Sequence, residues 1–129
     1  MRKILLALIL LINYTASFAQ STSDYETAVS KFQSFYNNRQ ADSIYAMMCD
    51  KLKNSTTKDN NAKTMGMLFA RFGQLKSYTF QNQKGNFTFY KTVFSKATLI
   101  MDMSLNKDNK LVTYNFAPYQ PDTAGYKKQ

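Results

Sequence analysis

The sequence contains no histidine and no tryptophan, and it has a single cysteine among its 129 residues. Without histidine, a His-based catalytic triad, a histidine-ligated metal site and a zinc finger are excluded. One cysteine cannot form a disulfide within the chain. Because Cys49 follows the apolar residues Met47 and Met48, we expect it to be buried as a small hydrophobic side chain.

The chain is nevertheless rich enough in apolar residues to fold. It is 44% hydrophobic and 19% charged, and its length is that of one domain. Seventeen basic residues outnumber eight acidic ones, for a formal charge of +9. The lysines are spread along the chain and no groove-reading motif accompanies them, so we expect no nucleic-acid partner.

The first residues are typical of an export signal. Arg2 and Lys3 precede an apolar run over residues 4–12, which is far shorter than the roughly 20 residues of a membrane span. Ser17 and Ala19 place small side chains three and one residues before a cleavage point. We therefore predict a signal peptide over residues 1–19 and a periplasmic or extracellular protein with no membrane span after cleavage, an uncleaved anchor being the alternative.

The mature chain is predicted to be one domain, residues 20–129, with an ordered core over 23–119 and a frayed tail over 120–129. Ser23 and Glu26 fit a capping box that starts a first helix ending at residues 37–38. A second helix begins near Asp42 and runs to Leu52, residues 53–61 form a polar loop, and a third helix covers residues 62–72. Gly73 suits the position after the last turn, where positive φ costs glycine little.

Beyond Gly73 the apolar period changes from about 3.6 to 2. Strands are predicted over residues 75–81, 87–94, 97–105 and 111–117, joined by links too short for anything but antiparallel neighbours. The predicted fold class is α+β, with three N-terminal helices packed on a curved four-stranded antiparallel meander.

Three stretches resemble a known superfamily. Residues 35–45 (FYNNRQADSIY), 69–77 (FARFGQLKS) and 97–112 (ATLIMDMSLNKDNKLV) are similar to the nuclear transport factor 2-like superfamily, a cystatin-like α+β cone, and within it to secreted bacterial domains of unknown function. A glycine common in the last strand of that family is replaced here by Thr113 or Tyr114. The resemblance implies a concave sheet closed by helices into a pocket that, in many relatives, binds small apolar molecules.

Strand and helix parity suggests which side chains line such a pocket. The candidate ligand-binding residues are Tyr45, Phe72, Phe89, Met101 and Tyr114. The carboxylates are scattered singly, so we expect no metal and no cofactor. The predicted function is that of a non-enzymatic domain binding a small apolar ligand or a protein partner through the concave sheet, with a homodimer as an open alternative.

A second hypothesis is enzymatic. Asp102 is the one acid in the middle of a predicted strand, and a few relatives are isomerases or dehydratases. In that interpretation Asp102 is a pocket base held by Tyr78 or Tyr90. The alternative is a solvated carboxylate facing Lys91 across the sheet.

Phe87 and Phe89 add an independent observation. They share one predicted strand face with Val93, while Tyr90 and Phe94 occupy the other, so both faces carry apolar bulk. This pattern is typical either of core plus rim or of an exposed aromatic patch that meets a partner. A solid core would favour protein interaction through the outer sheet face.

Overall fold

The computed structural model describes residues 21–121. The predicted signal peptide, and the predicted tail from residue 122 onward, lie outside these described residues. Along the chain the elements are α2 (Thr22–Asn37), α3 (Ala41–Ala46), α4 (Asp50–Asn54), α5 (Lys58–Phe72), β1 (Leu75–Lys84), β2 (Phe87–Phe94), β3 (Thr98–Leu105) and β4 (Leu111–Pro118). The strands form one open sheet in the order β1-β2-β3-β4, each antiparallel to its neighbour. The predicted α+β class and the meander are therefore confirmed.

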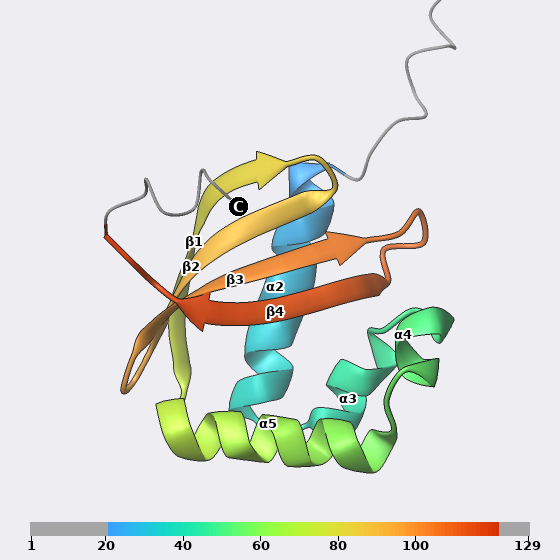
Figure 1. Cartoon of the computed structure of the whole chain (residues 1–129), viewed down its shortest axis with the longest axis horizontal. Helices are drawn as coiled ribbons and strands as arrows, with labels where there is room; N and C mark the ends of the chain where they lie inside the picture. The colour runs from blue at the N-terminus through green and yellow to red at the C-terminus, as the bar shows by residue number, and fades with distance from the viewer. Residues whose placement is uncertain (1–20, 122–129) are drawn as a thin grey trace, which may run out of the picture.

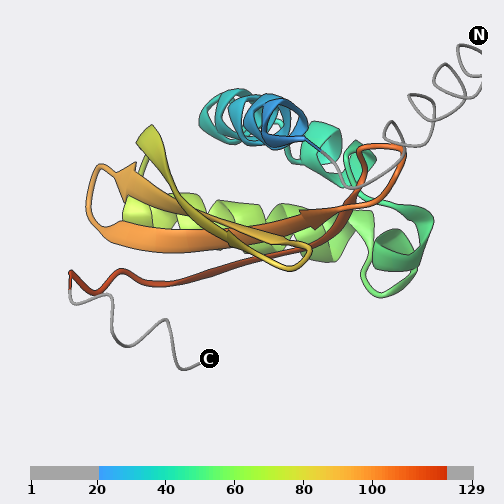
Figure 2. The ribbon, with the colours of Figure 1, turned by 90° about the horizontal axis from the view of Figure 1, so that it is seen from above.

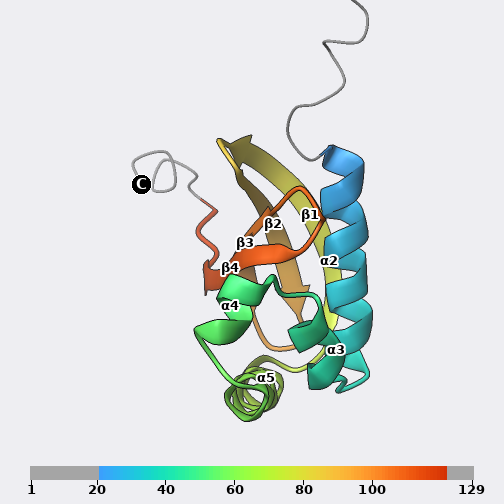
Figure 3. The ribbon, with the colours of Figure 1, turned by 90° about the vertical axis from the view of Figure 1, so that its right-hand side faces the viewer.

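The sheet has two different faces. Helix α2 crosses one face, here called the inner face, while α5 lies beyond the β4 edge (Figure 1). Seen from above, α2 lies along one side of the sheet (Figure 2). The side view shows α5 end-on below α2 and the strands (Figure 3). The outer face, on the opposite side, has no helix of the described chain packed on it.

The core lies between α2 and the inner face. Helix α2 buries one apolar stripe, which includes Val29 and Phe32, as its three-to-four-residue spacing predicts. The Phe32 ring contacts the rings of Tyr114 and Phe116 on β4, each at a centroid distance of 5.8 Å. Full burial of such a side chain contributes roughly 2–3 kcal/mol.

The start of α2 differs from the prediction. The N-cap is Ser21, whose hydroxyl accepts from the Asp24 N–H at 3.2 Å while the Asp24 carboxylate accepts from the Ser21 N–H at 3.1 Å. The predicted cap at Ser23 with Glu26 was wrong by two residues. Both pairs fit the pattern of a capping box, and the earlier one adds a further half-turn to the helix.

The predicted second helix is two short helices, α3 and α4. Between them Met48 forms a parallel bridge to Leu111 of β4. The Cys49 N–H donates to the Leu111 carbonyl, and the Leu111 N–H donates to the Met47 carbonyl, both at 2.8 Å. These long-range bonds take backbone groups that a continuous helix would use itself, so the helix breaks here.

Other boundaries moved by a few residues. Helix α5 begins at Lys58 because the Thr57 hydroxyl caps it, accepting from the Asn60 N–H at 3.0 Å. Gly73 ends α5 with φ 78°, as predicted. Strand β1 continues to Lys84, so the first hairpin turn is only the two residues after it.

Candidate binding surfaces

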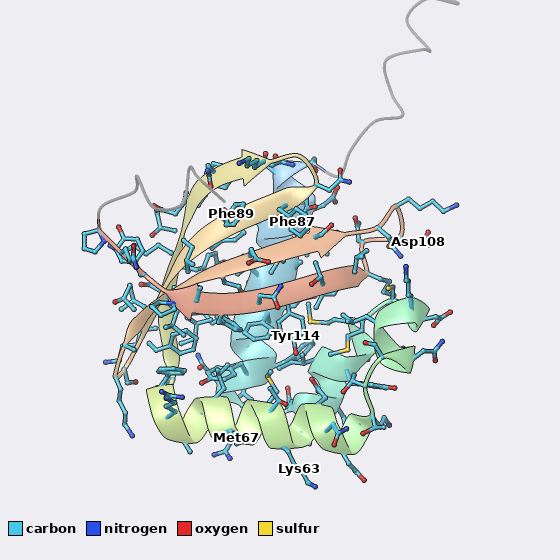
Figure 4. All side chains as sticks on the ribbon, viewed as in Figure 1. Lys63, Met67, Phe87, Phe89, Asp108 and Tyr114 are labelled. Atoms are coloured by element: carbon cyan, nitrogen blue, oxygen red, sulfur yellow. The ribbon has the colours of Figure 1, made fainter. Side chains whose placement is uncertain are left out.

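The outer face carries exposed aromatic side chains of β2, while Phe80 of β1, which is 41% exposed, lies on the inner face against the Tyr90 ring. On β2, Phe87, Phe89, Lys91 and Val93 point to this face, because Tyr90 and Phe94 belong to the core. Phe87 is 42% exposed, and Phe89 is partly buried. Figure 4 shows both rings next to each other on β2, with α2 behind the sheet.

Two rows of cross-strand neighbours define this surface. Asn82, Phe89, Asp102 and Asn115 form one row across all four strands. The next row is Thr79, Lys91, Ile100 and Ala117. A sheet face with ring, methyl and amide groups in register offers both apolar contact and hydrogen bonds to a partner.

One end of the outer face is occupied by the chain that follows β4. The Tyr119 N–H donates to the Thr98 carbonyl at 3.2 Å. The Lys91 ammonium lies 4.9 Å from the centre of the Tyr119 ring, in a cation–π contact. Ile100, the cross-strand neighbour of Lys91, is only 5% exposed. The exposed aromatic area is therefore at the other end, around Phe87.

Asp102 lies on the outer face, partly buried. The Asn115 amide donates to its carboxylate at 3.2 Å. The tyrosines considered as its partners, Tyr78 and Tyr90, pack with the inner-face core, so the structure does not bring them to Asp102. Lys91 is one row away, opposite Ile100. Asp102 thus sits on the outer face next to Asn115, separated by the sheet from the two tyrosines that the enzymatic hypothesis requires.

Four of the five candidate pocket residues belong to the core. Met101 is fully buried, and Tyr45, Phe72 and Tyr114 pack partly buried against the same cluster. Phe89 is on the opposite face of the sheet. Phe72 contacts Phe94 at a ring distance of 5.9 Å, and Figure 4 places Tyr114 between β4 and α5. These four side chains pack in the core, and Phe89 lies apart from them, so the five do not line one common pocket.

The two candidate tyrosines use their hydroxyls within the fold. The Tyr114 hydroxyl donates to the Asn61 side-chain oxygen at 3.2 Å, and the Asn61 amide donates to the Ala41 carbonyl at 3.0 Å. Burial raises the pKa of Tyr114 to about 12. The Tyr45 hydroxyl is 3.4 Å from the Lys53 carbonyl, a weak bond. Tyr114 therefore joins β4 to α5 and α3 rather than presenting a reactive phenol.

Two surface grooves lie elsewhere. The larger, of about 400 Å³, lies between α2, α3 and the β3–β4 turn. Its apolar lining is Ala28, Phe35, Ala46 and Met47; the polar and charged lining is Asp24, Thr27, Lys31, Ser43, Asp108, Asn109 and Lys110. The smaller, of about 170 Å³, lies where α2, α3 and α5 meet. None of the five candidate residues lines either groove. Sequence reasoning missed the larger groove because its three segments are far apart along the chain.

Cys49 is partly buried and has no disulfide partner. It is thus less enclosed than the sequence indicates, since the break between α3 and α4 places it beside β4 near the surface. Within residues 21–121 no three Cys, Asp or Glu side chains gather as a metal site would require. In the same part of the chain, no helix combines the length and apolar character needed to cross a membrane.

Comparison with known proteins finds no significant match to a family model, to a curated protein or to a solved structure.

Proposed function

We propose that this chain is an exported, non-enzymatic binding domain that takes a protein partner on the outer face of its sheet. The observation that carries the proposal is the contrast between the two faces. On the inner face α2 covers the sheet and Met101, Met103 and Tyr90 are fully buried, with Phe80 of the edge strand β1 41% exposed. No helix of the described chain covers the outer face, where Phe87 is 42% exposed. Exposed aromatic side chains in a patch are typical of protein interaction sites.

Charge indicates the chemistry of the partner. The β1–β2 hairpin, residues 75–94, contains Lys76, Lys84 and Lys91 and no acidic residue. A surface of rings among ammonium groups is complementary to an acidic protein surface with an apolar side chain at its centre. Within residues 21–121, Asp102 is the only acidic residue on the four strands, and it already accepts a hydrogen bond from Asn115.

Export and family membership are parts of the same proposal. The charged start, short apolar run and small residues before Gln20 support cleavage of a signal peptide. The mass of the purified mature protein tests this, since a chain starting at Gln20 is expected. An open four-stranded meander with α2 across one face and α5 beyond the β4 edge supports a cone-like domain of the nuclear transport factor 2-like kind.

Crosslinking from inside the producing cell tests the binding surface. A photo-reactive phenylalanine analogue replaces Phe87 in one variant. In a matched variant it replaces Met67, which is 73% exposed on α5 and points away from the sheet in Figure 4. We expect a discrete adduct with an acidic protein from position 87 and none from position 67.

A second step measures the same interaction with purified components. The variant Lys84→Glu, at the cross-strand neighbour of Phe87, should bind the identified partner at least tenfold more weakly, and salt should weaken binding of the wild-type protein. Equal adducts from both positions, no adduct, or an adduct between two copies of this chain would each contradict the proposal. The last result would instead establish the homodimer.

The groove favours a second candidate function. Its volume of about 400 Å³ is within the range of small-molecule sites, and its lining combines apolar side chains with charges of both signs. The substitution Ala46→Trp should abolish binding of a small ligand there, because the indole ring would fill the groove from an exposed position on α3. The enzymatic alternative with Asp102 as a base predicts loss of turnover in Asp102→Asn with unchanged stability.

A further inference from the structure

Two hydroxyl groups on the inner side of β2 are buried without a hydrogen-bond partner. They are the Thr88 Oγ1 and the Tyr90 Oη atoms. Thr88 is 1% exposed and Tyr90 is 0% exposed, and both side chains point to the inner face. A buried hydroxyl with no partner destabilises the folded state, so native proteins rarely leave two so close along one strand.

The next residue on the same face shows how the fold satisfies such a group when it can. The Thr92 hydroxyl donates to the Leu99 carbonyl at 2.9 Å, across the β2–β3 ladder. Thr88 pairs with Met103 and Tyr90 with Met101, and neither methionine side chain offers a strong acceptor. Thr88 and Tyr90 therefore lack a cross-strand acceptor for their hydroxyls on the face of the sheet that α2 covers.

The surroundings of the Tyr90 hydroxyl are polar. The Tyr25 hydroxyl on α2 is already used twice, donating to the Asn86 carbonyl at 2.9 Å and accepting from the Leu105 N–H at 3.2 Å. Burial raises the pKa of Tyr90, and the Glu26 carboxylate and the Tyr78 phenol nearby raise it further. Ionisable groups of α2 and β1 therefore lie within electrostatic reach of the buried Tyr90 hydroxyl on β2.

We infer that this region, between the first half of α2 and the β1–β2 hairpin, is a binding site for ordered internal water. Water suits it chemically, because one molecule accepts from one hydroxyl and donates to another acceptor such as a carboxylate. The same site excludes an apolar ligand from this end of the inner face, since such a ligand would leave both hydroxyls unsatisfied.

Conservative substitutions distinguish a bound water from two hydroxyls that are buried without any partner. Tyr90→Phe and Thr88→Val each remove only the hydroxyl function. If water is bound, each variant should raise the unfolding equilibrium constant about fivefold, because the water loses a partner and is itself left unsatisfied. Thr92→Val, which loses the bond to Leu99, is the matched control and should also raise the constant.

A high-resolution crystal structure of the wild-type protein gives an independent measurement that needs no variant to fold. We expect a water oxygen within hydrogen-bond distance of Tyr90 Oη or Thr88 Oγ1. An empty region, or variants of Tyr90 and Thr88 that are as stable as the wild type or more stable while Thr92→Val is destabilised, would overturn the inference.

Discussion

Asn37 and Leu75 are joined by two hydrogen bonds in opposite directions. The Asn37 amide donates to the Leu75 carbonyl at 2.9 Å, and its oxygen accepts from the Leu75 N–H at 2.8 Å. One side chain at the end of α2 thereby satisfies both backbone groups of the first residue of β1. Leu75 is fully buried, so neither group has water as a substitute.

The first prediction concerns this pair. Asn37→Ala leaves a buried N–H without a partner and should lower the free energy of unfolding by about 2 kcal/mol. The Leu75 carbonyl keeps its bond from Gln33 at 3.0 Å, which limits the loss. Asn38→Ala is the control, since its amide bonds only the exposed Ser34 carbonyl. Urea unfolding of the two variants measures the difference, and equal losses would contradict the prediction.

The second prediction contrasts two glycines. A Cβ at Gly73 would lie 2.9 Å from the Ser95 Cβ, on a backbone with φ 78°. Gly73→Ala should therefore cost more than about 1 kcal/mol. Gly66 is inside α5, where an added Cβ meets nothing within 4 Å. Gly66→Ala should stabilise the protein by about 0.5–1 kcal/mol because alanine favours the helix. Thermal unfolding measures both changes: the melting temperature should fall for Gly73→Ala and rise for Gly66→Ala.

The third prediction tests the start of α2. Ser21→Ala removes the hydroxyl that caps the Asp24 N–H and should cost about 1 kcal/mol. Ser23→Ala changes an exposed residue inside the first turn and should change stability by less than about 0.5 kcal/mol. If Ser23 were the cap, as the sequence pattern suggests, the two results would be exchanged.

The fourth prediction concerns alkaline pH. Burial raises the pKa of Tyr36 to about 12, although the nearby Arg39 charge lowers it, and burial raises that of Tyr114 to about 12. An unfolded chain releases these protons near pH 10, so the folded state binds more protons between the two values. The free energy of unfolding should then fall as pH rises from about 10 to about 12.

Spectroscopic titration checks this directly. The absorbance of ionised tyrosine in the folded protein should show late-titrating phenols, and Tyr114→Phe should remove part of the late signal and flatten the fall in stability. A titration complete near pH 10 while the protein is still folded would contradict it.

Much of the sheet was predictable because its signal is local. Alternation in residues 97–105 places Met101 and Met103 together, and both are buried as that pattern requires. The break between α3 and α4 was not predictable, because it comes from a bond to Leu111, more than sixty residues away. Helix boundaries moved where two overlapping patterns, at Ser21 and Ser23, fit the same rule.

The candidate site was less predictable than the fold. Phe89 and Met101 are of opposite parity across the β2–β3 ladder, since Phe89 pairs with Asp102 and Tyr90 pairs with Met101. That register is set by turn length, and no single strand reveals it. The exposure of Phe87 likewise depends on which face the helices cover, which periodicity alone does not decide.

The bridge between Met48 and Leu111 has a consequence for how the molecule can be divided. Through it, the α3–α4 connection pairs with the last strand in a single parallel β-bridge. A chain cut between Gly73 and Leu75 would give a helical fragment and a sheet fragment that each lack backbone partners supplied by the other. We expect neither fragment to fold alone. When the two are mixed they should fold together, because Leu111 of the final hairpin supplies the backbone partners of residues 47–49.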